Sequence, residues 1–119
     1  MVRPTILIVE PEPNEALSVR KLVVETAKFN VTTAYSTKEG RELLDKFPQL
    51  DCMVMIAEMD GCEETVSKAK SLKHSMPVIL LSANQNIRCG EADYHVSSHE
   101  PQELVDLLRF LFGDPRQLK

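Results

Sequence analysis

Short apolar runs recur along this chain, and each one stops at a small or polar residue. Four are continuous enough to stand out: Thr5–Val9 before Glu10, Cys52–Ile56 before Ala57, Val78–Leu81 before Ser82, and Tyr94–Val96 before Ser97. Aliphatic and β-branched runs of this length are typical of strands that are buried on both faces of a parallel sheet. We therefore predict strands at these four runs and a further strand over Val31–Ala34.

Segments with helical periodicity fill the gaps between the predicted strands. Glu12-Pro13-Asn14 is expected to open the first helix, because proline is tolerated in a first helical turn. Ser36, with Glu39 three residues later, forms a capping box that begins the second helix. The remaining helices are expected after the Asp60-Gly61 turn and from Pro101 to Gly113.

The alternation of strands and helices predicts an α/β domain in which right-handed crossovers join parallel strands. Five strands within 119 residues indicate a flavodoxin-like, doubly wound sheet of order 2-1-3-4-5 with helices on both faces. Ligands of such sheets bind in the crevice at the carboxyl ends of the strands. We expect a single domain over residues 1–113, with the polar residues 114–119 as the start of a linker or tail.

Composition excludes two classes of partner. The formal net charge of −4 argues against a nucleic-acid-binding surface, which would need clustered lysine and arginine. No apolar run approaches the ~18 residues of a membrane-spanning helix, and the first residues do not resemble a secretory signal. We therefore expect a cytoplasmic protein that binds neither nucleic acid nor a membrane.

The three cysteines show neither metal-ligand spacing nor the close pairing of a redox dithiol. Cys52 opens an apolar strand and is expected to behave as a small buried hydrophobic residue. Cys62 and Cys89 could lie near one another at the carboxyl edge of the sheet, but we expect no redox or metal role for them. An odd cysteine count without a framework fits a reducing cytosol.

Three segments resemble parts of response-regulator receiver domains of two-component signalling. They are Ile6–Asn14, an aliphatic strand that ends in an acid; Pro77–Ala83, whose strand ends in a hydroxyl residue; and Ala92–Val96, which is similar to the segment with the switch aromatic. The resemblance covers residues 5 to about 112. It implies a site in which two acids hold Mg²⁺, an aspartate accepts a phosphoryl group, and a lysine and a hydroxyl bind that group.

At most of these positions the chain departs from the pattern that the resemblance implies. The matching positions are Glu10 and Pro11 for the two acids, Ile56 or Ala57 for the acceptor, Ser82 for the hydroxyl and Ser97 for the lysine. Proline cannot ligate a metal, and neither acceptor candidate can be phosphorylated. A phosphoryl dianion would also face uncompensated carboxylates. The phosphorylation site is therefore predicted to be degenerate.

The resemblance has two further implications for signalling. Tyr94 matches the switch aromatic, and the stretch between Ser82 and Tyr94 is too short for the fourth helix of the family, which we expect to be shortened or lost. Its loss would uncover one flank of the last helix, where Val105, Phe110 and Phe112 form a possible interaction surface. The alternative, which we favour, is that these three side chains cover the sheet edge.

The acidic residues near the carboxyl edge of the sheet can each be interpreted in two ways, with or without a functional role. Glu58 could replace a phosphoryl group and hold an active-like state, or it could be a solvated loop acid, which we favour. Glu10 and Glu12 could bind Mg²⁺ weakly together with Asp60. We instead favour a strand-end remnant and a helix N-terminal acid, and we expect no cofactor.

Taken together, these features predict a degenerate receiver domain, a non-enzymatic signalling module that works through protein contacts. We expect a protein partner or a homodimer, and an output domain such as a transcription regulator in a larger protein. One alternative is a phosphate-accepting receiver with an atypical site built from Glu10, Glu58 and Asp60. Another is a flavodoxin-like cofactor binder or hydrolase, but Glu10–Pro13 stands where its phosphate loop would be.

Overall fold

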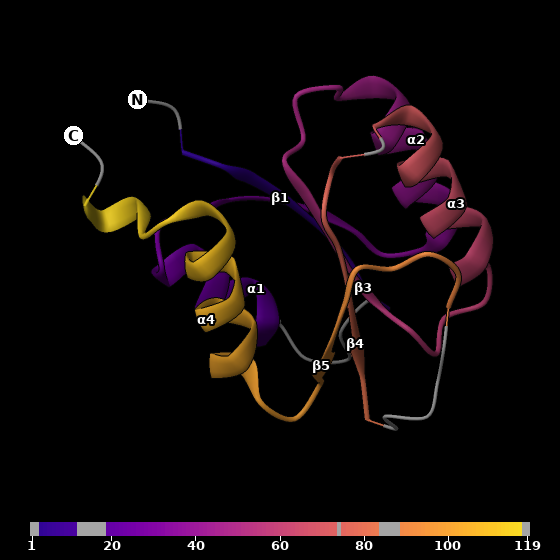
Figure 1. Cartoon of the computed structure of the whole chain (residues 1–119). Coiled ribbons are helices and arrows are strands. Elements are labelled where there is room, and N and C mark those ends of the chain that lie inside the picture. The colour runs from indigo at the N-terminus through magenta and orange to yellow at the C-terminus, as the bar shows by residue number, and fades with distance from the viewer. Residues whose placement is uncertain (1–2, 12–18, 74, 84–88, 118–119) are drawn as a thin grey trace.

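The computed structural model describes residues 3–11, 19–73, 75–83 and 89–117. Along these residues strands and α-helices alternate and are followed by a short 3₁₀ turn (Figure 1). In chain order the elements are β1 (Thr5–Val9), α1 (Val19–Thr26), β2 (Asn30–Ala34), α2 (Thr37–Lys46), β3 (Cys52–Ile56), α3 (Cys62–Leu72), β4 (Val78–Ser82), β5 (Tyr94–Ser97), α4 (Pro101–Phe112) and η1 (Pro115–Gln117).

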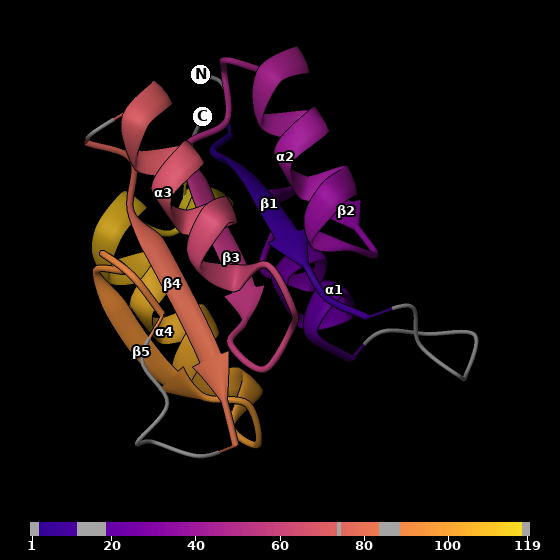
Figure 2. The same ribbon diagram turned by 90° about the vertical axis from the view of Figure 1, so that its right-hand side faces the viewer.

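The strands form one parallel sheet of order β2-β1-β3-β4-β5. In the register of the central strands, Ile8 of β1 lies opposite Thr33 of β2 and Val54 of β3. Helices α2 and α3 cover one face of the sheet, and α1 and α4 cover the other (Figures 1 and 2). The predicted doubly wound architecture and strand order are confirmed.

Successive side chains of each central strand enter two different apolar cores. The core under α2 and α3 receives Leu7, Val9, Met53, Met55, Val78 and Leu80. The core under α1 and α4 receives Ile6, Ile8, Cys52, Val54, Ile79 and Leu81. Because both faces are covered, β1, β3 and β4 appear in the sequence as continuous apolar runs and show no alternation with polar residues.

The predicted capping box starts α2. The Ser36 hydroxyl accepts the backbone N–H of Glu39 at 3.0 Å, and the Glu39 carboxylate accepts the N–H of Tyr35 at 3.2 Å. The last helix, α4, also has its expected bounds, with Pro101 in its first turn and Gly113 as its cap. These local signals placed both helices correctly, because the Ser36 side chain satisfies a backbone N–H at the start of α2 and proline has no N–H to leave unpaired in the first turn of α4.

A set of polar contacts fastens the start of α3 to α2. The Thr37 hydroxyl donates to the Asp60 carbonyl at 2.7 Å, and the Thr65 hydroxyl donates to the Gly61 carbonyl at 2.7 Å. Arg41 Nη1 donates to the Thr65 hydroxyl at 3.0 Å. Gly61, the N-cap residue, adopts a φ of 83° within this network. The network therefore fixes both the position and the backbone conformation of the turn that follows β3.

Two predictions involve segments that the structure describes only in part. The expected helix start at Glu12-Pro13-Asn14 lies outside the described residues, among which α1 begins at Val19. In the connection from β4 to β5, residues 89–93 form turns and a bend without a helix, while residues 84–88 lie outside the described part. The part of this connection that is described agrees with a fourth helix that is shortened or lost.

The residues after α4 fold back against α1. Pro115 is buried, and Arg116 lines a groove between the two helices together with Leu22 and Gln102. The Arg116 guanidinium donates to both carboxylate oxygens of Asp114, to Oδ1 at 3.0 Å and to Oδ2 at 2.6 Å, and holds the pKa of that carboxyl at about 2. At least the first residues of the predicted tail therefore pack on the domain.

Within the described parts of the chain, no helix is both long enough and apolar enough to cross a membrane.

We predict that Gly61→Ala destabilises the domain more than Gly90→Ala. Both glycines have a positive φ, 83° and 61°, which costs an alanine about 1 kcal/mol. A Cβ at position 61 would also lie 2.6 Å from Thr37 Oγ1, whereas one at position 90 would touch Val66 at 3.5 Å. The steric conflict should add about 1–2 kcal/mol to the loss for Gly61→Ala, measured by urea unfolding. Equal losses in the two variants would contradict this role of the network.

Candidate functional site

The carboxyl ends of the strands meet at one edge of the sheet (Figure 2). We call the residues that follow or close these strands the rim: Glu10–Pro11, Ala57–Gly61, Ser82–Ala83 and Ser97–Ser98. Backbone pairing extends into the rim, where the N–H groups of Glu10, Ala57 and Ser98 donate to the carbonyls of Ala34, Leu81 and Ser82 at 3.0, 2.9 and 3.0 Å. The sheet therefore holds the backbone of the candidate site.

Glu10 is a buried acid that is neutralised from within the protein. It has no exposed surface, and its Oε2 accepts a hydrogen bond from Arg20 Nε of α1 at 2.8 Å. The Arg20 side chain is 30% exposed, so one end of the ion pair faces solvent. The other carboxylate oxygen, Oε1, is buried and has no hydrogen-bond partner among the described residues. A buried carboxylate needs a compensating charge, and the guanidinium supplies it here.

The register identifies the residue that lies beside Glu10. Val9 of β1 pairs with Met55 of β3, so the next positions along the two strands are Glu10 and Ile56. Ile56 packs against the core under α1 and α4, whereas Ala57 is buried in the core under α2 and α3. Of the two acceptor candidates, Ile56 therefore occupies the place next to the acid. Each offers only carbon atoms, so neither side chain can be phosphorylated.

The described residues of the rim offer few ligands for a magnesium ion. Mg²⁺ requires several oxygen ligands in octahedral geometry, but Pro11 supplies no side-chain ligand and Glu10 is engaged by Arg20. Asp60 lines a hollow beside the start of α3, on the opposite face of the sheet from Arg20. Glu12, the other acid considered in the sequence, lies outside the described residues. The described residues contain no group of three acidic, histidine or cysteine side chains that could hold a metal ion.

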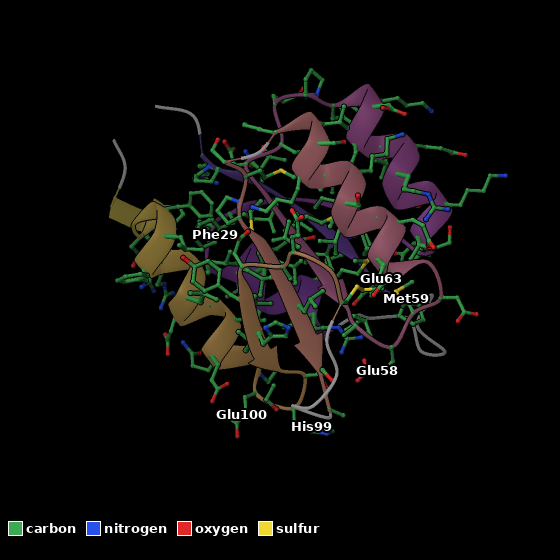
Figure 3. All side chains as sticks on the ribbon, turned by 45° about the vertical axis from the view of Figure 1, so that its right-hand side comes forward. Phe29, Glu58, Met59, Glu63, His99 and Glu100 are labelled. Atoms are coloured by element: carbon green, nitrogen blue, oxygen red, sulfur yellow. A yellow bond between two sulfur atoms is a disulfide. The ribbon has the colours of Figure 1, made fainter. Side chains whose placement is uncertain are left out.

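Glu58 joins the loop after β3 to the end of β4. Its Oε1 accepts the Ser82 hydroxyl at 2.8 Å and the Ala83 backbone N–H at 3.1 Å. Ser82 is buried, while Glu58 lies at the exposed edge of the rim (Figure 3). Hydrogen bonds to an ionised acceptor are stronger than neutral ones. Glu58 is thus an exposed loop acid, as the favoured interpretation had it, but its carboxylate also has two specific donors that the sequence did not predict.

The two candidate residues in β5 are held by the strand. Tyr94 lies opposite Ile79 and packs, partly buried, against the core under α1 and α4. The Ser97 hydroxyl accepts the N–H of His99 at 3.2 Å. His99 and the neighbouring Glu100 are exposed at the same edge of the sheet (Figure 3). Ser97 thus brings no positive charge to the position where the resemblance implies a lysine.

A disulfide joins Cys62, the first residue of α3, to Cys89 in the connection between β4 and β5. The two residues are 27 apart in sequence, and their Cα atoms are 6.2 Å apart. Closing a chain loop of this size contributes on the order of 3 kcal/mol to stability. The sequence analysis allowed the two cysteines to lie near one another, and the structure joins them; the inference from the odd cysteine count that the chain has no disulfide framework is wrong. The sequence does contain a signal that the two cysteines lie close together. Each cysteine is next to a glycine in a turn, Gly61 or Gly90, at the same edge of the sheet.

Only part of the possible interaction surface on the last helix is exposed. Val105 is 3% exposed and belongs to the core under α1 and α4, and Phe112 packs partly buried against the same core. Phe110 is 81% exposed and is the one member of the set that faces solvent. Two of the three side chains therefore cover the sheet, as the alternative interpretation had it, and no continuous patch of all three exists.

Several solved structures share this fold and are receiver domains. The receiver domain of a sensor histidine kinase from Pseudomonas aeruginosa, with a magnesium ion in its active-site cleft, has a TM-score of 0.81 and 17% identity over 94% of this chain and 99% of that chain. A response regulator receiver domain protein from Clostridium thermocellum has a TM-score of 0.76 and 18% identity over 98% and 99%. The response regulator TrrA of Thermotoga maritima, in complex with Mg²⁺–BeF, has a TM-score of 0.69 and 27% identity over 91% and 98%.

No protein-family profile and no curated protein matches the chain. The structural matches show that it has the fold of response-regulator receiver domains, as the sequence resemblance predicted.

We predict that Arg20→Met lowers the free energy of unfolding by about 2 kcal/mol, because it leaves the buried Glu10 carboxylate unpaired. This is less than the ~3–5 kcal/mol typical of a fully buried pair, since the Arg20 side chain is 30% exposed to screening solvent. Adding Glu10→Gln to Arg20→Met should restore at least half of the loss, measured by urea unfolding of all four proteins of the cycle. Strictly additive losses would contradict an energetic coupling between the two side chains.

Proposed function

We propose that this chain is a degenerate receiver domain that takes part in signal transduction through protein contacts and does not accept a phosphoryl group. The fold supports the part of the proposal that concerns signal transduction. The side chains of the rim support the part that concerns phosphorylation. Apolar groups stand beside Glu10 where a nucleophilic carboxylate would be needed, and a serine stands in place of the lysine.

The observation that carries the proposal is the pair of hydrogen bonds to Glu58. The resemblance implies that the hydroxyl at the end of β4 bonds to a transferred phosphoryl group. In this chain the Glu58 carboxylate accepts that hydroxyl, from Ser82, and the adjacent N–H of Ala83. An anionic group of the chain itself thus occupies donors that an incoming phosphate would use. We propose that Glu58 holds the rim permanently in the arrangement that these two bonds define.

Charge at the rim supports the same proposal. A phosphoryl dianion at the end of β4 would approach the Glu58 carboxylate, and like charges repel one another. The Arg20 guanidinium is already bonded to Glu10, so a phosphate could recruit it only by releasing a buried acid. A phosphate-accepting site with displaced acids would have to overcome both costs.

The partner we propose is a protein. The exposed Phe110 on α4 offers an aromatic anchor for such a partner or for a second copy of the chain. We further propose that the domain regulates an attached output unit, such as a transcription regulator, in the cytoplasm, and that it has no enzymatic activity or nucleic-acid contact of its own.

We predict that acetyl phosphate with Mg²⁺ adds no phosphate to the chain, because the side chains beside Glu10 offer no acceptor. Intact mass spectrometry checks this, with a receiver domain that has a complete acidic site as the positive control in the same solution. Beryllofluoride with Mg²⁺ should likewise leave the amide NMR signals of the rim in place. A phosphorylated residue anywhere in the described rim would overturn the proposed function.

A second prediction tests Glu58 itself. Glu58→Ala should shift the amide NMR signal of Ala83 and lower the free energy of unfolding by about 1 kcal/mol, since two donors lose their acceptor. Glu91→Ala removes an exposed loop acid from the β4–β5 connection and serves as the matched control, with an expected change within about 0.5 kcal/mol. If the two variants behave alike, Glu58 does not hold the rim.

A further inference from the structure

A small apolar pocket opens between α2 and α3, toward the carboxyl ends of the two helices. We call it the α2–α3 pocket; its volume is about 180 Å³. Its wall combines buried apolar side chains with two exposed ones: Leu44, Leu50, Ala69 and Met76 are buried, and Phe47 and Leu72 are exposed. An apolar pocket that is open to water and has exposed apolar residues in its wall can take up an apolar group of a partner.

Phe110 of α4 is an apolar group that this chain itself presents. At 81% exposed, it is the most exposed large apolar side chain among the described residues. A phenyl ring suits the size of the α2–α3 pocket, since an apolar cavity of about 150 Å³ already admits benzene. Helix α4 covers the opposite face of the sheet from α2 and α3 (Figure 1), so Phe110 cannot reach the pocket of its own chain. The ring of one copy can enter only the pocket of another.

Two acidic residues accompany Phe110 on α4. Glu103 and Asp106 precede it by seven and four positions and are exposed, so the three side chains share one stripe of the helix. Asp106 accepts the side-chain amide of Gln102 at 2.9 Å, and neither carboxylate forms an ion pair with a described residue. Arg109, which borders the stripe, faces Asp114 at 3.7 Å. The aromatic ring is therefore flanked by negative charge.

Lysines accompany the α2–α3 pocket. Asp45 in the wall of the pocket pairs with Lys68, which neutralises it. Lys73, also in the wall, donates to the Leu50 carbonyl at 3.1 Å and forms no ion pair with a described residue. Lys46, the last residue of α2, adds an exposed ammonium group. The pocket is thus apolar inside and positively charged at its edge, which makes it complementary to the acidic and aromatic stripe on α4.

We propose that the chain associates with a second copy of itself by inserting Phe110 into the α2–α3 pocket of that copy. The carboxylates of Glu103 and Asp106 then face the ammonium groups of Lys46 and Lys73. Because the two surfaces lie on opposite faces of the sheet, the contact is heterologous and leaves one Phe110 and one pocket unused in each pair. Further copies add at both ends. The contact is small, so the association is weak and needs a high local concentration.

Self-association of this kind deepens the proposed function, on which it rests, because it names the protein partner as a second copy of the chain. The two fail separately. A chain that accepts phosphate from acetyl phosphate would contradict the proposed function and leave the self-association unaffected. A chain that stays monomeric and accepts no phosphate would contradict only the self-association.

Sedimentation equilibrium of the native chain, from about 10 μM to about 1 mM, tests the association. We expect the average mass to rise steadily with concentration. Phe110→Ala should weaken the association about ten- to a hundredfold, because no aromatic ring then leaves water on contact. Tyr35→Ala removes an exposed aromatic side chain at the other end of α2 from the pocket and is the matched control, with wild-type association expected. A chain that stays monomeric, or one that associates equally well without Phe110, would overturn the proposal.

Mixing two variants then identifies the two halves of the contact. Leu72→Glu places a negative charge in the wall of the pocket and should weaken the association as Phe110→Ala does. An equimolar mixture of the two still contains one intact ring, on the Leu72→Glu chain, and one intact pocket, on the Phe110→Ala chain. It should form a dimer of wild-type affinity that adds no further copies, which also shows that both variants are folded. A mixture that associates no better than the separate variants would refute the heterologous contact.

Salt tests the charges around the ring. Raising the salt concentration from about 50 mM to about 500 mM should weaken the association severalfold, because exposed charges are screened. Asp106→Asn should reduce this salt dependence, since one carboxylate that faces the lysines is removed. Association that strengthens with salt would overturn the charge complementarity.

Discussion

A carboxylate buried at the end of a central strand must find a positive charge, and the rest of this rim depends on how the chain meets that requirement. Glu10 is fully buried and bonded to Arg20 of α1. With the charge neutralised by a guanidinium of the same chain, a metal ion is not needed to stabilise the strand end. The neighbouring position can then be apolar, and Ile56 joins the core there at no electrostatic cost.

At the end of β4, too, a side chain of the same chain satisfies the polar groups of the rim. Glu58 supplies an acceptor for the hydroxyl and the amide at the end of β4, so those donors are satisfied without a ligand. Polar groups that converge on a crevice usually mark a place where a ligand completes the hydrogen bonding. Here the completion comes from within the chain, which is the physical basis for proposing a module that presents a fixed surface and does not turn over a phosphoryl group.

The sequence patterns predicted the fold correctly because each pattern depends only on residues that are close together in the chain. Continuous apolar runs located the strands, and Ser36 and Pro101 marked helix starts that the structure has in the same places. The rim contacts were missed because they join distant residues. Glu58 and Ser82 are 24 apart, and no periodicity links them. Val105 was assigned to a possible interaction surface because the loss of the fourth helix was expected to uncover it, but its side chain packs into the core under α1 and α4.

The network around Gly61 also determines which parts of the domain can move relative to one another. Thr37, Thr65 and Arg41 bind the turn before α3 to α2, so the two helices and that turn behave as one stiff unit on their face of the sheet. A force applied at the rim would therefore displace little on the face of the sheet that α2 and α3 cover. The edge strand β5 and helix α4 take no part in this network, so these contacts leave that side of the domain free of any direct tie to α2.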